Sequence, residues 1–277
     1  MADQEQEHDF DEFAGEKQHH FGKLVVRTYE DFMENAIGGV VTRASKDLAR
    51  WAAEVPQNWH GCQVLELGSG CGLVSSALLQ MGASVIATDL AEILPHLRYN
   101  LSLNDCEGCA DWHVQALNWG SLSDRSALRA KMRHDGADAI FAANCVYSRD
   151  TVEMFLSTLQ GLSGPQTLAL MCGVPVPPAI HGDVSIIDEL LGALPCFFDS
   201  YLLEVPGEAD GVLGELRSAS DSKDSNDQNF SPLATELGGA RGLTAAALAD
   251  GIWLFKLPGS PCPSWARPLL VLPSISG

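Results

Sequence analysis

The stretch VLELGSGCGLV, residues 64–74, decides the fold of this chain. A short apolar run enters a turn that holds three glycines, and an apolar segment, residues 73–79, leaves the turn. This order predicts a strand, a tight turn and a helix. Gly68 and Gly70 can adopt backbone conformations that other residues avoid, so the turn can bring its N–H groups close to a ligand.

A carboxylate follows at a spacing that suits a nucleoside. The next predicted strand, 84–88, ends in Asp89, which lies 21 positions after Gly68. An acidic side chain at this point can accept hydrogen bonds from ribose hydroxyls. The pattern Gly-x-Gly-x-Gly differs from the Gly-x-Gly-x-x-Gly of dinucleotide enzymes, which favours a nucleoside without a pyrophosphate. The alternative is a ligand-free βαβ unit, and the acidic strand end argues against it.

Three short motifs resemble those of one enzyme family. ELGSGCG at 66–72, together with Asp89, resembles the S-adenosylmethionine site of class I, or seven-strand, methyltransferases. ALNWG at 116–120 and AANCVY at 142–147 resemble the Leu-Asp-Trp-Gly and Ala-Asp-x-x-Tyr signatures of methyltransferase family 16. That family comprises the DxxY-type protein-lysine methyltransferases. The resemblance covers roughly residues 21–203 and one late strand.

The resemblance implies a donor side and an acceptor side. The cofactor would be S-adenosyl-L-methionine, with no metal. Asp89 would accept from the ribose hydroxyls, and Trp119 would offer an aromatic face to the adenine. The implied cofactor-binding residues are Thr42, Glu66, Gly68, Ser69, Gly70, Cys71, Gly72, Asp89, Asn118, Trp119 and Ala143, and the implied catalytic residues are Asn144 and Tyr147.

Three positions depart from the family pattern. Thr42 stands where the family commonly has Trp, so the aromatic wall of the cofactor pocket is missing there. Asn118 and Asn144 stand where the family has Asp. The family's carboxylate at the position of Asn144 would hold a lysine ammonium. Without that carboxylate, the electrostatic attraction to the ammonium is smaller by on the order of 4 kcal/mol, at a separation of about 4 Å and an effective dielectric of 20.

The predicted function is a protein N-methyltransferase with a lysine acceptor, and two alternatives stay open. The first is a cofactor-binding interaction protein that has lost catalysis. The second is methylation of another nitrogen, in glutamine, histidine or a small molecule, because Asn-x-x-Tyr also resembles the Asn-Pro-Pro-Tyr of amide and adenine methyltransferases. Cys145 and Val146 are not prolines, so that likeness is partial. A structural alternative has Asn144 capping the strand and Tyr147 packing.

Composition limits the partners. The net charge of −19 opposes binding to nucleic-acid phosphates and suits a protein substrate with a basic or lysine-containing surface. No apolar run reaches membrane-spanning length. The acidic N-terminus resembles neither a secretory signal nor a transit peptide, so a cytoplasmic or nuclear protein with reduced cysteines is expected. The lone CxxC at 106–109 is predicted to be a loop, and His19 and His20 are predicted to be solvated.

The domain organisation follows from changes in composition. Residues 1–20 are predicted to be an acidic disordered tail, 21–206 the methyltransferase domain and 207–245 an acidic flexible insertion. Residues 246–277 would supply the last strand and a C-terminal tail. Strands alternating with helices predict an α/β fold, a doubly wound, Rossmann-like sheet whose last strand, according to the resemblance, is antiparallel. Segments 1–18 and 218–227 are predicted to be dispensable for folding.

Overall fold

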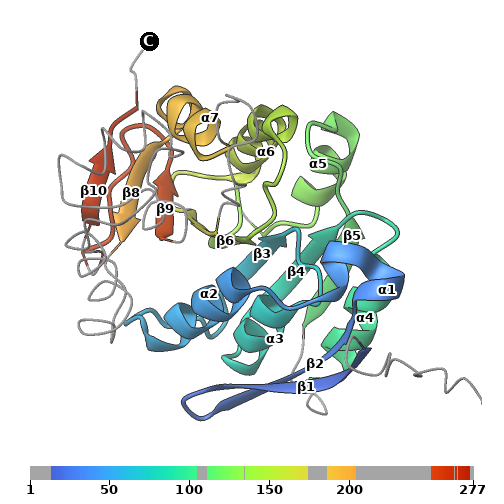
Figure 1. Cartoon of the computed structure of the whole chain (residues 1–277). Coiled ribbons are helices and arrows are strands. Elements are labelled where there is room, and N and C mark those ends of the chain that lie inside the picture. Colours follow the sequence, from blue (N-terminus) through green and yellow to red (C-terminus); the bar gives the residue numbers. More distant parts are fainter. Residues whose placement is uncertain are drawn as a thin grey trace, which may run out of the picture.

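The computed structural model describes residues 14–104, 111–133, 135–173, 186–203, 251–264, 266 and 268–274. They form an eight-stranded sheet with helices on both faces, and a separate two-stranded hairpin (Figure 1). The strands of the sheet are β3 Gln63–Leu67, β4 Ser84–Asp89, β5 Trp112–Ala116, β6 Ala139–Ala143, β7 Leu168–Cys172, β8 Asp199–Leu203, β9 Ile252–Lys256 and β10 Pro268–Leu272.

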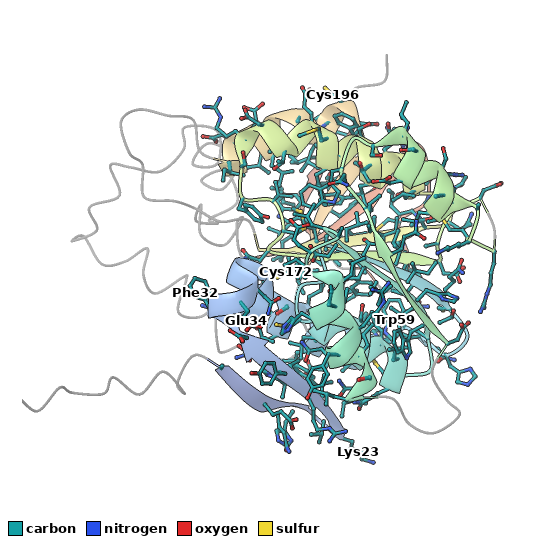
Figure 2. All side chains as sticks on the ribbon, turned by 90° about the vertical axis from the view of Figure 1, so that its right-hand side faces the viewer. Lys23, Phe32, Glu34, Trp59, Cys172 and Cys196 are labelled. Carbon is teal, nitrogen blue, oxygen red and sulfur yellow. The ribbon has the colours of Figure 1, made fainter. Side chains whose placement is uncertain are left out.

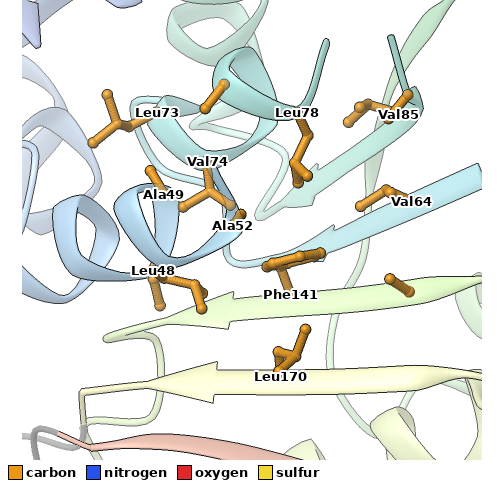
Figure 3. Close-up of a cluster of buried hydrophobic side chains, with 14 of the residues drawn as sticks. Leu48, Ala49, Ala52, Val64, Leu73, Val74, Leu78, Val85, Phe141 and Leu170 are labelled. Carbon is orange, nitrogen blue, oxygen red and sulfur yellow. The ribbon is translucent and has the colours of Figure 1, made fainter. Parts of the chain in front are cut away.

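The helices lie in two layers. One face of the sheet carries α2 Arg43–Glu54, α3 Leu73–Gln80 and α4 Leu94–Ser102, and the other carries α5 Leu122–Arg129, α6 Arg149–Leu162 and α7 Ile186–Ala193 (Figure 1). Val64 packs on the first face and its neighbour Leu65 on the second, because successive strand residues point to opposite sides. Figure 3 shows the first core, where Leu48 of α2 and Leu78 of α3 surround Phe141.

Strands β3 and β6 are fully buried, as expected for parallel strands covered on both faces. The strand order is β10-β8-β9-β7-β6-β3-β4-β5. The neighbours from β7 to β5 are parallel, and β9 runs antiparallel to both β7 and β8. The order reverses between β3 and β6, so ligands are expected at the carboxyl ends of these two strands.

The sheet has one strand more than the seven that were predicted. The apolar stretch near the C-terminus forms β10, which pairs antiparallel with β8. It satisfies backbone groups along the edge of β8 that would otherwise be unpaired. The predicted strand and helix around the glycine turn appear as β3 and α3, and the strand predicted at 84–88 appears as β4, with ends that differ by one residue. The predicted insertion and the CxxC motif lie outside the described residues.

The predicted limit of the acidic tail is wrong. Strand β1 Ala14–Phe21 pairs along its length with β2 Leu24–Asp31, so residues 14–20 belong to a hairpin. His19, predicted to be solvated, is only 8% exposed and lies 2.9 Å from Thr28 Oγ1. The hairpin pairs two segments whose apolar residues are too sparse to be recognised separately. Figure 2 shows Lys23 at the hairpin tip and Phe32 and Glu34 at its opposite end, on α1 Phe32–Asn35.

Two asparagines fasten β2 to the domain, Asn100 in α4 and Asn104 just after the end of that helix. Asn100 accepts from the N–H of Tyr29 at 2.6 Å and donates to its carbonyl at 3.0 Å. Asn104 does the same for Arg27, at 2.8 and 2.7 Å. The Asn104 amide also donates to the carbonyl of Asn100 at 2.9 Å, which keeps the two side chains together, and residues two apart on a strand share an edge. The two amides therefore act as a substitute neighbour for the free edge of β2.

Candidate functional site

The carboxyl ends of β3, β4, β5 and β6 open into one cavity of about 570 Å³. This volume lies within the range of small-molecule sites. The segment between the hairpin and α2 forms the remaining wall, with Glu34, Gly38 and Val41 among its lining residues. The cavity thus occupies the point where the strand order reverses.

The structure brings all but one of the predicted site residues to this cavity. The residues that line it are Thr42, Glu66, Gly68, Ser69, Gly70, Cys71, Asp89, Asn118, Trp119, Ala143, Asn144 and Tyr147. Gly72 is the exception. It has φ +70° at the N-terminus of α3, and a Cβ on it would come within 2.7 Å of Leu97 Cδ1. Gly72 therefore permits close packing of α3 against α4 and does not line the cavity.

Close packing also explains Gly68. Its φ is +65°, and an added Cβ would lie 2.6 Å from the Cβ of Cys145. The turn after β3 and the segment after β6 are therefore in direct contact across the floor of the cavity. A larger residue at position 68 would separate them, besides straining the backbone.

Asp89 is held at the end of β4 by two backbone groups. Its Oδ2 accepts from the N–H of Gly70 at 2.7 Å, and its Oδ1 accepts from the N–H of Leu90 at 2.7 Å. Burial raises the pKa of Asp89, and these two hydrogen bonds oppose the rise. Each carboxylate oxygen retains a lone pair, so Asp89 can still accept hydrogen bonds from a ligand.

Glu66 joins the end of β3 to the start of α3. It is 2% exposed and accepts hydrogen bonds from the Oγ and, at 3.0 Å, the N–H of Ser75. Burial raises its pKa from 4.5 to about 7. Near neutral pH, Glu66 is therefore present in both protonated and ionised forms.

The loop after β5 is fixed by α5 and α6. The N–H of Asn118 donates to Asp124 at 3.1 Å, which lowers the pKa of that carboxyl group. The N–H of Gly120 donates to Thr158 Oγ1 at 2.9 Å. Between them, the Trp119 ring contacts Phe155 edge-on at 5.1 Å between centroids. These contacts hold an aromatic side chain at the wall of the cavity.

Asn144 lies directly after β6 with φ +51°, a conformation that Asn and Asp adopt more easily than other non-glycine residues. Its N–H donates to the carbonyl of Cys172 at 2.8 Å. Within the described part of the chain, its side-chain amide makes no hydrogen bond. Tyr147 is 53% exposed, and burial of the rest, followed by the charge of Asp89, raises its pKa. The structural alternative is therefore not observed: the Asn144 amide does not cap the strand, and the larger part of Tyr147 stays exposed.

The sequence did not reveal several residues of the wall. They come from the segment after the hairpin, the loop after β4 and the start of α6: Glu34, Asn35, Gly38, Val40, Val41, Leu90, Glu92, Ile93, Thr151 and Met154. Their local sequence has no motif. Of these residues, only Glu92 could have been expected near the site, because it lies three residues after Asp89 in the sequence. The acidic lining residues are Glu34, Glu66, Asp89 and Glu92, and none of the described residues that line the cavity is Lys, Arg or His.

Two features are absent from the described ranges. No three His, Cys, Asp or Glu residues there are grouped so that they could hold a metal ion. None of the helices there combines the length and apolar character that crossing a membrane requires.

The doubly wound sheet, its antiparallel strand β9 and a cavity at the reversal of strand order define the architecture expected of class I methyltransferases. A family model described as lysine methyltransferase matches residues 23–174, more than half of the chain. The chain belongs to this family.

Two proteins of similar sequence are named as lysine methyltransferases. Mouse protein-lysine methyltransferase METTL21E is 40% identical over 108 residues, which are 39% of this chain and 43% of that protein. EEF1A lysine methyltransferase 3 of Xenopus tropicalis is 27% identical over 195 residues, 70% of this chain and 81% of that protein. The chain thus spans less than half the length of the mouse relative.

A solved structure shows a more distant likeness. The 16S rRNA N2 methyltransferase RsmC of T. thermophilus, in complex with AdoMet and guanosine, has 21% sequence identity and a TM-score of 0.43. The match covers 59% of this chain and 43% of that one.

Proposed function

We propose that this protein is an S-adenosylmethionine-dependent N-methyltransferase that acts on a lysine side chain of a protein substrate. One observation carries the proposal: the implied cofactor residues at the ends of β3 and β4 share a cavity with Asn144 and Tyr147 at the end of β6. Donor and acceptor sites would then be adjacent, which is what a transfer reaction needs.

The cavity fits the cofactor in three respects. Asp89 has free lone pairs for ribose hydroxyls, in addition to its bonds to Gly70 and Leu90. Trp119 supplies an aromatic surface beside the adenosine end, where Thr42 supplies none. The turn from Gly68 to Cys71 also lines the cavity, and its backbone would face the methionine part. When bound, this cofactor would supply a methyl group on a sulfonium, and a neutral amine would take the methyl group in line while S-adenosylhomocysteine leaves as the thioether.

The residues of the chain would contribute positioning. A lysine must lose its proton first, which costs about 4.6 kcal/mol at pH 7 from its reference pKa. The carbonyl of the Asn144 amide can accept an N–H of the neutral amine and orient its lone pair. Tyr147, at the exposed side of the cavity, would contact the methylene chain of the entering lysine. The all-acidic set of charged lining residues favours a cationic side chain on entry. This chemistry needs no metal.

Labelling tests the proposal. The purified protein is incubated with tritiated S-adenosylmethionine and a cell extract, followed by electrophoresis and autoradiography. A labelled protein band that Asp89→Ala abolishes is expected, with Asp150→Asn on the exposed side of α6 as a matched control. Mass spectrometry must then find methylated lysine. Binding of the donor with no labelled protein would favour a non-catalytic binding protein.

Asn144 supports a second candidate, methylation of an uncharged nitrogen. A free amide can pair with another amide through one donor and one acceptor, whereas the family's carboxylate can only accept. A glutamine amide would fit such a pair. Modified glutamine or histidine in the labelled protein, without modified lysine, would replace the first proposal by this one.

A further inference from the structure

Glu30 is a buried acid next to the cavity wall. It lies near the end of β2 and is 5% exposed. Its Oε2 accepts from the N–H of Val41 at 3.1 Å and from Lys17 Nζ at 3.3 Å. Its Oε1 lies 3.8 Å from Nε2 of His19. Glu30 is not among the predicted site residues, and it does not line the cavity.

The bond to Val41 matters because of where Val41 lies. Val40, Val41 and Thr42 all line the cavity, and Thr42 is also the N-cap of α2. Residues 40–42 belong to neither a helix nor a strand, so no secondary structure fixes them. The carboxylate of Glu30 supplies the acceptor for the backbone N–H in the middle of this segment.

The surroundings of Glu30 keep that carboxylate in place. A buried carboxylate is costly unless it is paired and hydrogen-bonded. Lys17, across the hairpin on β1, supplies the opposite charge, and its own side chain is 51% exposed. His19 contacts Thr28 Oγ1 at 2.9 Å, and burial lowers the pKa of His19. The hairpin thus carries a buried acid that is paired with Lys17 and also accepts a hydrogen bond from the cavity wall.

We propose that Glu30 is a positioning residue for the cofactor: its hydrogen bond to the N–H of Val41 holds the segment 40–42 in the place where it forms one wall of the cavity. This inference rests on the proposed function. The hairpin is then part of the donor site and more than a cover for the first core, although none of its own residues reaches the cavity.

Two substitutions of Glu30 distinguish the effect of its side-chain length from the effect of its charge. Glu30→Gln keeps the length of the side chain and an oxygen acceptor but loses the charge. Glu30→Asp keeps the charge but is one methylene shorter, so it cannot reach Val41. Positioning predicts that Gln is tolerated and Asp is not, whereas a purely electrostatic role for Glu30 predicts the opposite order.

Calorimetry with S-adenosylhomocysteine is the direct measurement. We expect Glu30→Gln to bind within about threefold of the wild type and Glu30→Asp to bind about tenfold more weakly, the loss typical of one charge-assisted hydrogen bond. In turnover, Glu30→Asp should raise KM for the donor and change kcat less than about twofold. Glu16→Gln, an exposed acid on β1, should bind like the wild type.

The outcomes are distinct. Equal binding by all variants, or weaker binding by Glu30→Gln than by Glu30→Asp, would overturn the positioning role and leave the proposed function standing. Absence of binding by the wild type would overturn both. Thermal melts accompany each titration. If Glu30→Asp loses affinity only at temperatures where it is already unfolding, the role of Glu30 is structural and the proposal fails.

Discussion

The backbone N–H of Gly70 donates a 2.7 Å hydrogen bond to the carboxylate of Asp89. The two residues lie 19 positions apart and on different turns, one after β3 and one at the end of β4. Asp89 therefore shapes the glycine turn as well as offering acceptors to a ligand. A substitution at position 89 is expected to alter both.

Asp89→Ala should weaken binding of S-adenosylhomocysteine by roughly 10- to 100-fold. The variant loses the ribose acceptor and leaves the N–H of Gly70 unpaired, and charge-assisted hydrogen bonds contribute about 1.5–3 kcal/mol. Calorimetry measures the change, with Asp150→Asn as the control. Equal affinity for wild type and Asp89→Ala would remove Asp89 from the site.

Glu66 should make stability fall as the pH rises. Its pKa is 4.5 in the ordinary state and about 7 when buried in the fold, so the folded protein binds the proton more tightly. The corresponding stabilisation is fully present below pH 4.5 and is lost as the pH rises to about 7. Glu66→Gln does not titrate, so its stability relative to the wild type should rise by about 3 kcal/mol over this interval.

Urea unfolding at pH 4.5 and 7.5 measures that difference for Glu66→Gln. Glu54→Gln, an exposed acid in the last turn of α2, is the control and should show no such trend. A difference between wild type and Glu66→Gln that stays constant with pH would mean that Glu66 ionises normally.

Asn144→Asp should raise activity on a lysine substrate. The left-handed backbone at φ +51° accommodates Asp as readily as Asn, so the fold is retained. The new carboxylate attracts an ammonium, and KM for the substrate should fall about tenfold, because desolvation offsets much of the attraction of about 4 kcal/mol. Steady-state kinetics on the identified substrate measures it, with Tyr147→Phe assayed alongside. Activity on lysine that Asn144→Asp abolishes would contradict this role of position 144.

Asn104→Ala should destabilise the protein by about 1–3 kcal/mol. It leaves the N–H and carbonyl of Arg27 without their partners on the edge of β2. Urea unfolding measures the loss. Ser102→Ala, at the exposed last residue of α4, is the control and should change stability by less than about 0.5 kcal/mol. Equal stability of the two variants would show that β2 is held by other contacts.

Deletion of residues 1–18 should lower the melting temperature, contrary to the expectation from composition. The deletion removes Lys17 and more than half of β1, residues 14–18, leaving Glu30 buried without its cation. Deletion of 1–13 leaves β1 intact and serves as the comparison. Identical melting of the two shortened proteins would show that β1 contributes little to the fold.

The sequence alone determined the central part of this protein. The strand, glycine turn and helix around Gly68, and the acid at the end of the next strand, depend on neighbours close in the chain. Hydrophobic periodicity and turn residues report such local structure directly. The strand ends then placed Asp89, Trp119 and Asn144 at one edge of a parallel sheet, because parallel strands end on the same side.

Only the tertiary structure decided the rest. Gly72 faces α4 and not the cavity, because α3 packs closely against Leu97. Residues 14–20 form part of a strand because Lys17 meets Glu30 across the hairpin and Asn104, 77 positions away from Arg27, binds the backbone of that residue. Val41, which lines the cavity, donates its N–H to Glu30 of the hairpin. These are single polar contacts between distant residues. They leave no periodic pattern in the sequence, and their free energy depends on burial that exists only once the chain has folded.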